Sequence, residues 1–522
     1  MPWLSCLAWE SLEAWCGIFL PQALIDIGLG LRRLIFPRLS GKFGIECDAG
    51  RISNQTLVQE ELSPYCQSMK IWLMVLMLCI VSCEILLADF EARKFISADG
   101  QKVISAVPVG YDQNAMVVFL KMPSGQLQQV QISKFSIEDQ LFIEDNKQQL
   151  SIMLAFLKMP KEIQSRFYDG LRQELVRTHK APPGSSAALA KFLARLKATQ
   201  NPDGSWVEGK KVSMTAMALL VYMAEGETPL DEDYGDAVTR AIAYLTNVAV
   251  KNGGKLADDV KDKHWPYQHA MATLALAEAY TICTTLGINF PKLKEATKMA
   301  GNWILNHQHT SGSWDYGYDM SGARGGDTSL AMWHVQAMRV CIMTGMWKMS
   351  EFVGSVRKAL AYVKKNQNSN GGIGYTSPNA YGDTGFTLTG AGMYAFQMWY
   401  KPHDPVVRKR VKYISKNARF KYNTEHADLY RQYYHALAMK HRGGKDWMGY
   451  KNMLGNQLIE NQAEDGSWKN VGGGAKILGI ASTYQGESEF ATHFRSCLCA
   501  FILQVPYRYD WNAVRVPMGF GG

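Results

Sequence analysis

The chain has 522 residues, 47% of them hydrophobic and 20% charged, with a formal net charge of +9 at pH 7. This length predicts roughly two to four domains, and the hydrophobic fraction excludes a wholly disordered chain. Lys and Arg occur in segments that also carry Asp and Glu, which argues against nucleic acid as a partner and predicts solvated basic surface.

Residues 1–68 show no repeat, motif or domain-sized pattern. We interpret them as a non-native or disordered extension, with translation starting at Met69. The alternative is a short membrane-associated extension, because Trp3, Trp9, Trp15 and Phe19 lie among apolar residues.

Residues 69–88 have the layout of a secretory signal peptide, since Lys70 precedes a short apolar run. The run reaches Ala88, is interrupted by Glu84, and falls short of the roughly 20 residues that a membrane-spanning helix needs. Ile80–Cys83 also resembles a bacterial lipobox, which implies lipidation of Cys83. Lipidation, cleavage after Ala88 and an uncleaved anchor remain open, and all three predict export to the cell envelope or periplasm.

A small β module is expected at 89–147. Strand-like runs at 102–106, 116–121 and 128–132 are separated by turn signals, and Ser136 is placed to cap a following helix. The residues Arg93–Phe95, Asp99–Gly100, Val118–Lys121 and Ser136–Gln140 resemble the Sla-one homology domain, an SH3-like module. The resemblance implies protein binding, with ubiquitin and cytoskeletal proteins among the family's partners; a structural spacer is the alternative.

After a helical linker at 148–186, residues 187–522 carry an internal repeat. A Gln is followed by Gly four residues later and by an aromatic or apolar residue six later at 200–206, 308–314, 367–373 and 462–468. Eroded copies fit near 249 and 418. The repeat is carried by seven structural residues: Gln200, Trp206, Gln308, Trp314, Gln367, Gln462 and Trp468.

Each repeat site follows an amphipathic helix and precedes a helix that is apolar almost all round. The apolar helices must be buried, whereas the amphipathic ones can lie outside. The apolar helices are predicted at 214–222, 269–283, 329–341, 386–399, 429–439 and 494–503. Six such pairs predict a mainly α fold, an (α/α)6 toroid, preceded by the SH3-like β module.

The repeat resembles the QW motif of squalene cyclases, and the predicted ring resembles the toroid that those enzymes share with protein prenyltransferases. The resemblance implies a terpenoid cyclase-like scaffold, but the family's chemistry is not evident. The DxDD proton donor is absent, and no Asp-x-Cys pair suggests a zinc site. Asp258–Asp262 matches a DDxxD diphosphate motif but lies in a charged loop, so we expect no metal and no cofactor.

Candidate functional residues gather where the inner helices should begin. Low-ranking catalytic candidates are Asp327, Asp383, His269 and His493, and ligand-cavity candidates are Trp265, Tyr267, Asp428 and Tyr430. Helix capping is the competing role for Asp327 and Asp383, and core packing is the competing role for His269.

Together these features predict an exported, noncatalytic scaffold that binds a protein through its β module or a hydrophobic small molecule in its toroid, with attachment to the membrane among the alternatives. The rival is an enzyme of the squalene cyclase or prenyltransferase class acting on an isoprenoid or other hydrophobic substrate.

Overall fold

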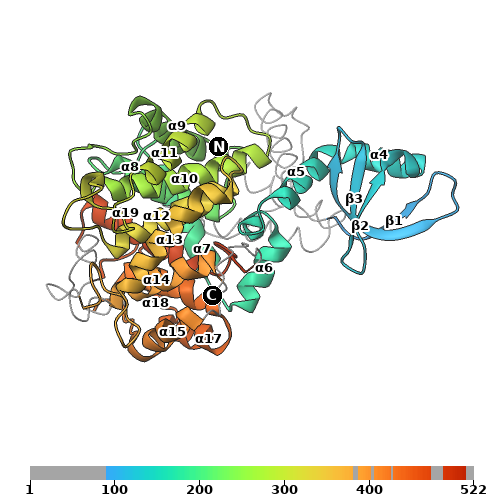
Figure 1. Ribbon diagram of the computed structural model, residues 1–522. Helices are drawn as coiled ribbons and strands as arrows, with labels where there is room; N and C mark the ends of the chain where they lie inside the picture. The colour runs from blue at the N-terminus through green and yellow to red at the C-terminus, as the bar shows by residue number, and fades with distance from the viewer. Residues whose placement is uncertain (1–89, 380–385, 401–404, 425–426, 472–485, 513–522) are drawn as a thin grey trace, which may run out of the picture. The chain divides into compact units, whose positions relative to one another are not determined.

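The computed structural model describes residues 90–379, 386–400, 405–424, 427–471 and 486–512 (Figure 1). The predictions for residues 1–88, including lipidation of Cys83, fall outside these ranges, and so does the candidate Asp383. Among the helices in the described ranges, none is both long and apolar enough to cross a membrane.

The β module is an antiparallel sheet in the order β1-β2-β3-β4. Its strands are β1 (Arg93–Ile96), β2 (Val103–Asp112), β3 (Val117–Lys121) and β4 (Leu127–Gln131). The 3-10 turn η1 (Ile132–Lys134) leads to α4 (Ile137–Asp145), where the Ser136 hydroxyl accepts the Asp139 N–H, as expected of a cap. Phe95, Val118 and Leu120 are fully buried in its small core.

Two details of the sheet differ from the sequence prediction. β1 is a strand at residues where no strand was predicted, and β2 runs beyond the predicted end at 106 as far as Asp112, where the turn at 113–116 begins. Pro108 and Gly110 flank a shift of register between β2 and β3. A β-bulge tolerates a proline that cannot donate to the ladder, so these residues bend the strand without ending it.

Three short elements join the sheet to the repeats: α5 (Lys147–Lys158), η2 (Gln164–Arg166) and α6 (Asp169–Thr178). The helical linker predicted at 148–186 therefore has two helices and a turn. η2 is buried against the ring through Ser165 and Arg166, whose side chains donate to the carbonyls of Tyr507 and Arg508.

The six apolar helices form the inner ring. They are α8 (Lys211–Ala224), α10 (Trp265–Thr285), α12 (Thr328–Met343), α14 (Phe386–Trp399), α16 (Leu429–Arg442) and α19 (Glu489–Leu503). Each packs against the next, and α19 packs against α8. Helices that are apolar all round gain most when they are covered on every side, and a closed ring provides this. The (α/α)6 arrangement predicted from the sequence is confirmed.

The amphipathic helices lie outside the inner ring (Figure 1). They are α7 (Ser185–Ala198), α9 (Gly235–Lys251), α11 (Leu293–Asn306), α13 (Met349–Lys365), α15 (Pro405–Asn417) and α17 (Gly444–Leu454), the last followed by the short α18 (Gln457–Glu460). In α13, for example, Val356, Ala359 and Val363 are buried while Lys358 and Lys365 are exposed. The 3.6-residue period thus sorts polar from apolar side chains.

The repeat motif joins each turn to the next outer helix. Gln200, Gln308 and Gln462 each donate from Nε2 to the Gly carbonyl of their own turn, at 2.8–3.0 Å. The same nitrogens donate to the carbonyls of Ala237, Ser355 and Ala188, which lie near the starts of α9, α13 and α7. The bond from Gln462 therefore connects the last repeat to the first.

The motif glycines allow each repeat turn to lie close against the next outer helix. A side-chain carbon at Gly204, Gly312, Gly371 or Gly466 would collide with the backbone of the next outer helix, and all four have positive φ. Only glycine meets both conditions at little cost. Each motif Trp donates from Nε1 to a carbonyl of the preceding outer helix, namely that of Leu196, Ile304 or Leu458.

Ring closure predicts that Gln462→Ala destabilises the protein as much as Gln308→Ala, by about 1–3 kcal/mol each, because each leaves two backbone carbonyls without their amide donor. Thermal and chemical unfolding of the two variants would measure this. Loss of stability in Gln308→Ala alone would show that the ring is not closed at Gln462.

Candidate functional site at the mouth of the ring

The inner helices begin on one side of the ring, which we call the mouth. The Tyr267 hydroxyl, in the first turn of α10, lies 3.3 Å from an oxygen of Asp327, the residue that precedes α12. Ser329, in the first turn of α12, shares a 3.0 Å hydrogen bond with Tyr430 of α16. Residues that lie far apart in the sequence therefore meet at this end.

Arg324 is the central group of the mouth. Its guanidinium donates to Asp315 and, at 2.6 Å, to Asp327, and it stacks 3.6 Å from the ring centre of Tyr316. Both carboxylates are buried, whereas the Arg324 side chain is 30% exposed. The arginine thus neutralises two carboxylates and still reaches solvent.

Tyrosine hydroxyls surround this group. Tyr375 shares a 2.8 Å hydrogen bond with Tyr316 and accepts from Arg324 at 3.2 Å. The exposed ring of His264 lies edge-on to Tyr316, with 4.6 Å between ring centres. The mouth therefore presents aromatic faces and hydroxyls around a cation.

Asp327 is held in place from several directions. One oxygen accepts the Leu330 N–H at 2.8 Å, which caps α12, as the competing interpretation of this residue expected. Burial raises the pKa of Asp327, and the hydrogen bonds from Leu330 and Arg324 oppose that rise. The carboxyl group is therefore occupied by protein groups.

The ring nitrogens of the two candidate histidines also lie in hydrogen-bonding contact with backbone groups. His269 accepts the Leu256 N–H at Nδ1 and lies 3.1 Å from the Ala300 carbonyl at Nε2, and burial lowers its pKa to about 3. His493 lies 3.2 Å from the Met214 carbonyl, and burial lowers its pKa to about 4. Trp265 is buried edge-on to His269. The structure does not bring His269 and His493 into hydrogen-bonding contact with Asp327.

Asp428 and Tyr430 lie at the start of α16. Asp428 accepts the Arg431 N–H at 2.9 Å and so caps the helix. Tyr430 is fully buried and contacts Tyr434 and Trp333. Of the four cavity candidates, Tyr267 and Tyr430 therefore reach the Asp327 and Ser329 region at the mouth.

Sequence reasoning missed Arg324, Asp315, Tyr316 and Tyr375. Asp315 directly follows the motif residue Trp314, and Arg324 lies three residues before Asp327. The short sequence distances from Arg324 to Asp315 and Asp327 could have indicated the two ion pairs. Tyr375 is 51 residues from Arg324, so only the closed ring could place it there.

The DDxxD match has structural roles. Asp258 accepts the Val212 N–H at 3.0 Å at the start of α8, and Asp262 accepts the His264 N–H at 3.0 Å just before α10. No group of His, Cys, Asp and Glu arranged to hold a metal ion occurs among the described residues. Cys283, Cys341, Cys497 and Cys499 are free and buried.

The opposite face is closed by buried ion pairs. Arg166 pairs with Glu278 of α10, and Arg339 of α12 pairs with Glu162 at 2.9 Å. The Lys440 ammonium donates to the Tyr509 carbonyl at 3.0 Å, and burial lowers the pKa of Lys440 to about 8. The segments before α7 and after α19 thus cover the ends of the inner helices.

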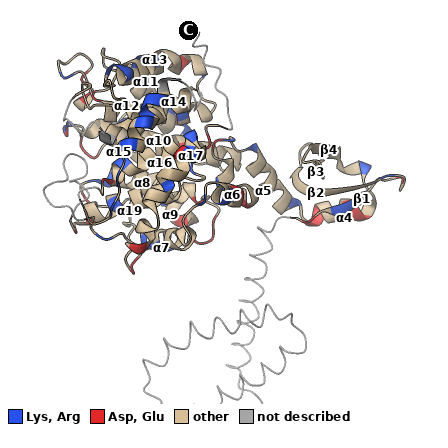
Figure 2. Cartoon of the chain, turned by 90° about the horizontal axis from the view of Figure 1, so that it is seen from below, with Lys and Arg blue, Asp and Glu red and all other residues tan. Residues whose placement is uncertain are grey.

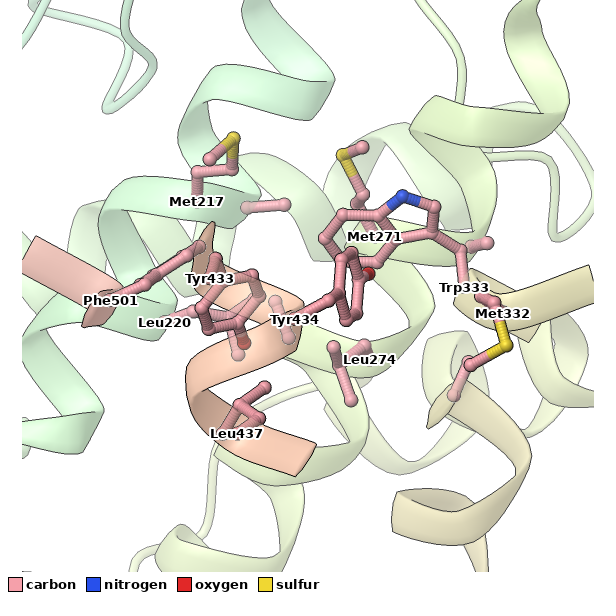
Figure 3. Close-up of a cluster of buried hydrophobic side chains, with 14 of the residues drawn as sticks. Met217, Leu220, Met271, Leu274, Met332, Trp333, Tyr433, Tyr434, Leu437 and Phe501 are labelled. Carbon is pink, nitrogen blue, oxygen red and sulfur yellow. The ribbon is translucent and has the colours of Figure 1, made fainter. Parts of the chain in front are cut away.

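Buried side chains of the inner helices meet in a cluster inside the ring (Figure 3). Gln336 of α12 donates to the Tyr434 hydroxyl of α16 at 2.9 Å, although α14 lies between these helices in the ring order. Tyr433 contacts Phe501 of α19, with 5.2 Å between ring centres. Met217, Leu220, Met271, Leu274, Met332, Trp333 and Leu437 complete the cluster.

No family model matches the chain, and no curated protein matches it. Among solved structures, the type II terpene cyclase MstE from Scytonema is 12% identical, with 62% of this chain and 97% of that one covered and a TM-score of 0.39. A glycosidase is 10% identical, with coverage of 64% and 98% and a TM-score of 0.42. A protein from Actinoplanes is 14% identical, with coverage of 62% and 99% and a TM-score of 0.37.

Arg324→Met should lower the free energy of unfolding by about 2–3 kcal/mol, because it leaves two buried carboxylates without a cation. Adding Asp327→Asn should recover part of this loss, since it removes one of the buried charges. Chemical denaturation measures both variants, with Lys294→Met at an exposed position as the control. Equal stability of Arg324→Met and the wild type would contradict the described ion pairs.

Buried His334 predicts a pH dependence of stability. Its Nε2 bonds the Tyr318 hydroxyl at 2.7 Å, and burial lowers its pKa from 6.5 to about 3. Between these values the unfolded chain takes up a proton that the folded chain does not, so this contribution is fully present above pH 6.5 and is lost as pH falls.

His334→Gln should therefore show a smaller fall in Tm between about pH 7 and about pH 4.5 than the wild type. The same substitution at exposed His264 is the control and should leave the fall unchanged. Identical pH profiles for His334→Gln and the wild type would show that His334 does not titrate in this way.

Proposed function

We propose that the chain is an exported, noncatalytic binding scaffold whose toroid offers the mouth as its ligand-binding face. The observation that carries this proposal is the cluster of buried apolar and aromatic side chains from α8, α10, α12, α16 and α19 inside the ring (Figure 3). A catalyst for a long hydrophobic substrate needs a cavity that encloses it, whereas a scaffold needs a rigid rim.

The electrostatics of the mouth support the same role. A proton donor must be free to give its proton to a substrate, yet Asp327 accepts from Leu330, Arg324 and Tyr267. Asp315 accepts from Arg324 and from the Tyr316 N–H. Arg324, Tyr316 and Tyr375 are partly exposed and can donate to a ligand without changing the fold.

For the β module we propose protein binding, on the basis of its resemblance to the Sla-one homology domain. Its four-stranded antiparallel sheet and capped helix are compatible with that resemblance. Export rests on the sequence of residues 69–88.

The rival function is catalysis on an isoprenoid or another hydrophobic substrate. The observation that favours it is Asp327, a buried carboxyl group at the mouth whose pKa is raised by burial. In that role Arg324 would have to move away, since it occupies the carboxylate.

Incubation with radiolabelled squalene, farnesyl diphosphate and geranylgeranyl diphosphate, with and without Mg²⁺, separates the two functions. We expect unchanged substrate and no retained label, for the wild type and for Asp327→Asn alike. Heat-denatured protein is the control. A product that the wild type forms and Asp327→Asn does not would overturn the noncatalytic proposal.

A further inference from the structure

The positive charge of the chain is concentrated in one part of the ring. Residues 348–421 contain thirteen Lys and Arg but only three Asp and Glu, which gives an excess of ten positive charges. The rest of the chain has 43 Lys and Arg and 44 Asp and Glu. The excess therefore exceeds the net charge of the whole protein. The even scatter of basic residues inferred from the sequence is incorrect for this stretch.

The structure places most of these residues on the outside of two outer helices. α13 exposes Arg357, Lys358, Lys364 and Lys365, and α15 exposes Arg408, Lys409, Lys412 and Lys416, with Arg419 and Lys421 following. In both helices the spacing of these residues forms one stripe along the solvent side. We call these ten residues the basic outer face.

The two stripes are neighbours. The turn after α13 places Gly371 against the backbone of Lys409 and Gly372 against the ring of Tyr413, both on α15. The apolar side of α13, with Val356, Leu360 and Val363, is buried in the ring. The turn between them therefore brings the two stripes to neighbouring helices, and blue segments lie beside the α15 label in Figure 2.

Several basic residues elsewhere on the ring are paired with acids. Arg195 pairs with Asp465, Lys211 with Asp203 at 2.8 Å, and Arg240 with Asp236 at 3.0 Å. On the basic outer face, Lys358, Lys364, Lys365, Arg408, Lys409, Lys412, Lys416 and Lys421 have no such ion pair within the described ranges. Glu351, the acid described on α13, lies in its first turn and accepts the Lys348 N–H.

Like charges at helical spacing repel one another, so this face is less favourable alone than against a negatively charged partner. We propose that the basic outer face docks the toroid on an anionic phospholipid surface. Clusters of four to eight basic residues on a helix surface are typical of such docking, in which the headgroup charge attracts each Lys and Arg.

Three features favour lipid over nucleic acid. Seven of the ten residues are Lys, a point charge suited to a diffuse headgroup layer, whereas bidentate recognition of phosphates and bases favours Arg. Among the aromatic side chains described between 348 and 421, none is exposed for base stacking. Both helices pack against inner helices, α13 against α12 and α15 against α14, and so neither projects from the ring as a helix that enters a groove does.

The contact is expected to be electrostatic and reversible. The exposed large hydrophobic side chains of the described part of the chain lie outside 348–421, so none on this face would insert into the acyl region. Salt should therefore release the bound protein, because the Debye length falls to about 3 Å at 1 M salt.

The test is co-sedimentation of the full-length protein with vesicles of equal parts phosphatidylglycerol and phosphatidylcholine, compared with phosphatidylcholine alone. The apolar run that ends at Ala88 would act on both vesicle types, so their ratio isolates the electrostatic part. We expect at least tenfold stronger binding to the anionic vesicles at low salt, and a ratio near one at about 1 M NaCl.

The fourfold variant Lys364→Glu, Lys365→Glu, Lys412→Glu and Lys416→Glu should lose this preference. The matched control, Lys191→Glu, Lys251→Glu, Lys294→Glu and Lys298→Glu, makes the same charge change at exposed positions outside the basic outer face and should keep it. Circular dichroism confirms that both variants fold.

Three results would overturn the proposal. The fourfold variant could bind anionic vesicles as the wild type does, or the control could lose as much binding as the fourfold variant. Alternatively, duplex DNA could bind more tightly than the vesicles at equal salt and lose its binding in the fourfold variant, which would make nucleic acid the partner.

Discussion

The close approach of each repeat turn to the next outer helix is the constraint on which the ring depends. A glycine in the turn removes the side chain that would collide with that helix. The glutamine amide then donates to two backbone carbonyls, one in the turn and one in the helix, and so joins them. Because Gln462 makes this bond to Ala188, the array closes on itself. Closure covers the inner helices on every side, which their apolar surfaces require.

Closure also determines where polar groups can lie. Polar side chains near the helix starts meet at the mouth, where Arg324 offsets the charge of Asp315 and Asp327. At the other end, Arg166 and Arg339 are paired with Glu278 and Glu162. Since buried ions are costly unless paired, these ion pairs offset the cost of burying charge at the two ends of the ring, while apolar and aromatic side chains of the inner helices pack between the ends.

The outer surface follows a different rule from the ends. Arg195, Lys211 and Arg240, on α7, α8 and α9, are paired with acids. By contrast, Lys358, Lys364 and Lys365 of α13 and Lys409, Lys412 and Lys416 of α15 are exposed and have no ion pair within the described ranges. Exposed charges cost little in stability, so this asymmetry is not imposed by folding. The basic outer face is therefore available for binding a partner, separately from the mouth.

The sequence by itself determined the helix pairs, their number and their inner or outer place, because apolar periodicity and the Gln-Gly-Trp spacing are local features. It also offered helix capping as the competing role of Asp327, and the carboxylate accepts the Leu330 N–H in that way. Only the tertiary structure decided that Arg324, Tyr316 and Tyr375 surround that aspartate, and that α13 and α15 place their basic residues side by side. These groups come together only when the ring closes, and no pattern within one helix encodes that contact.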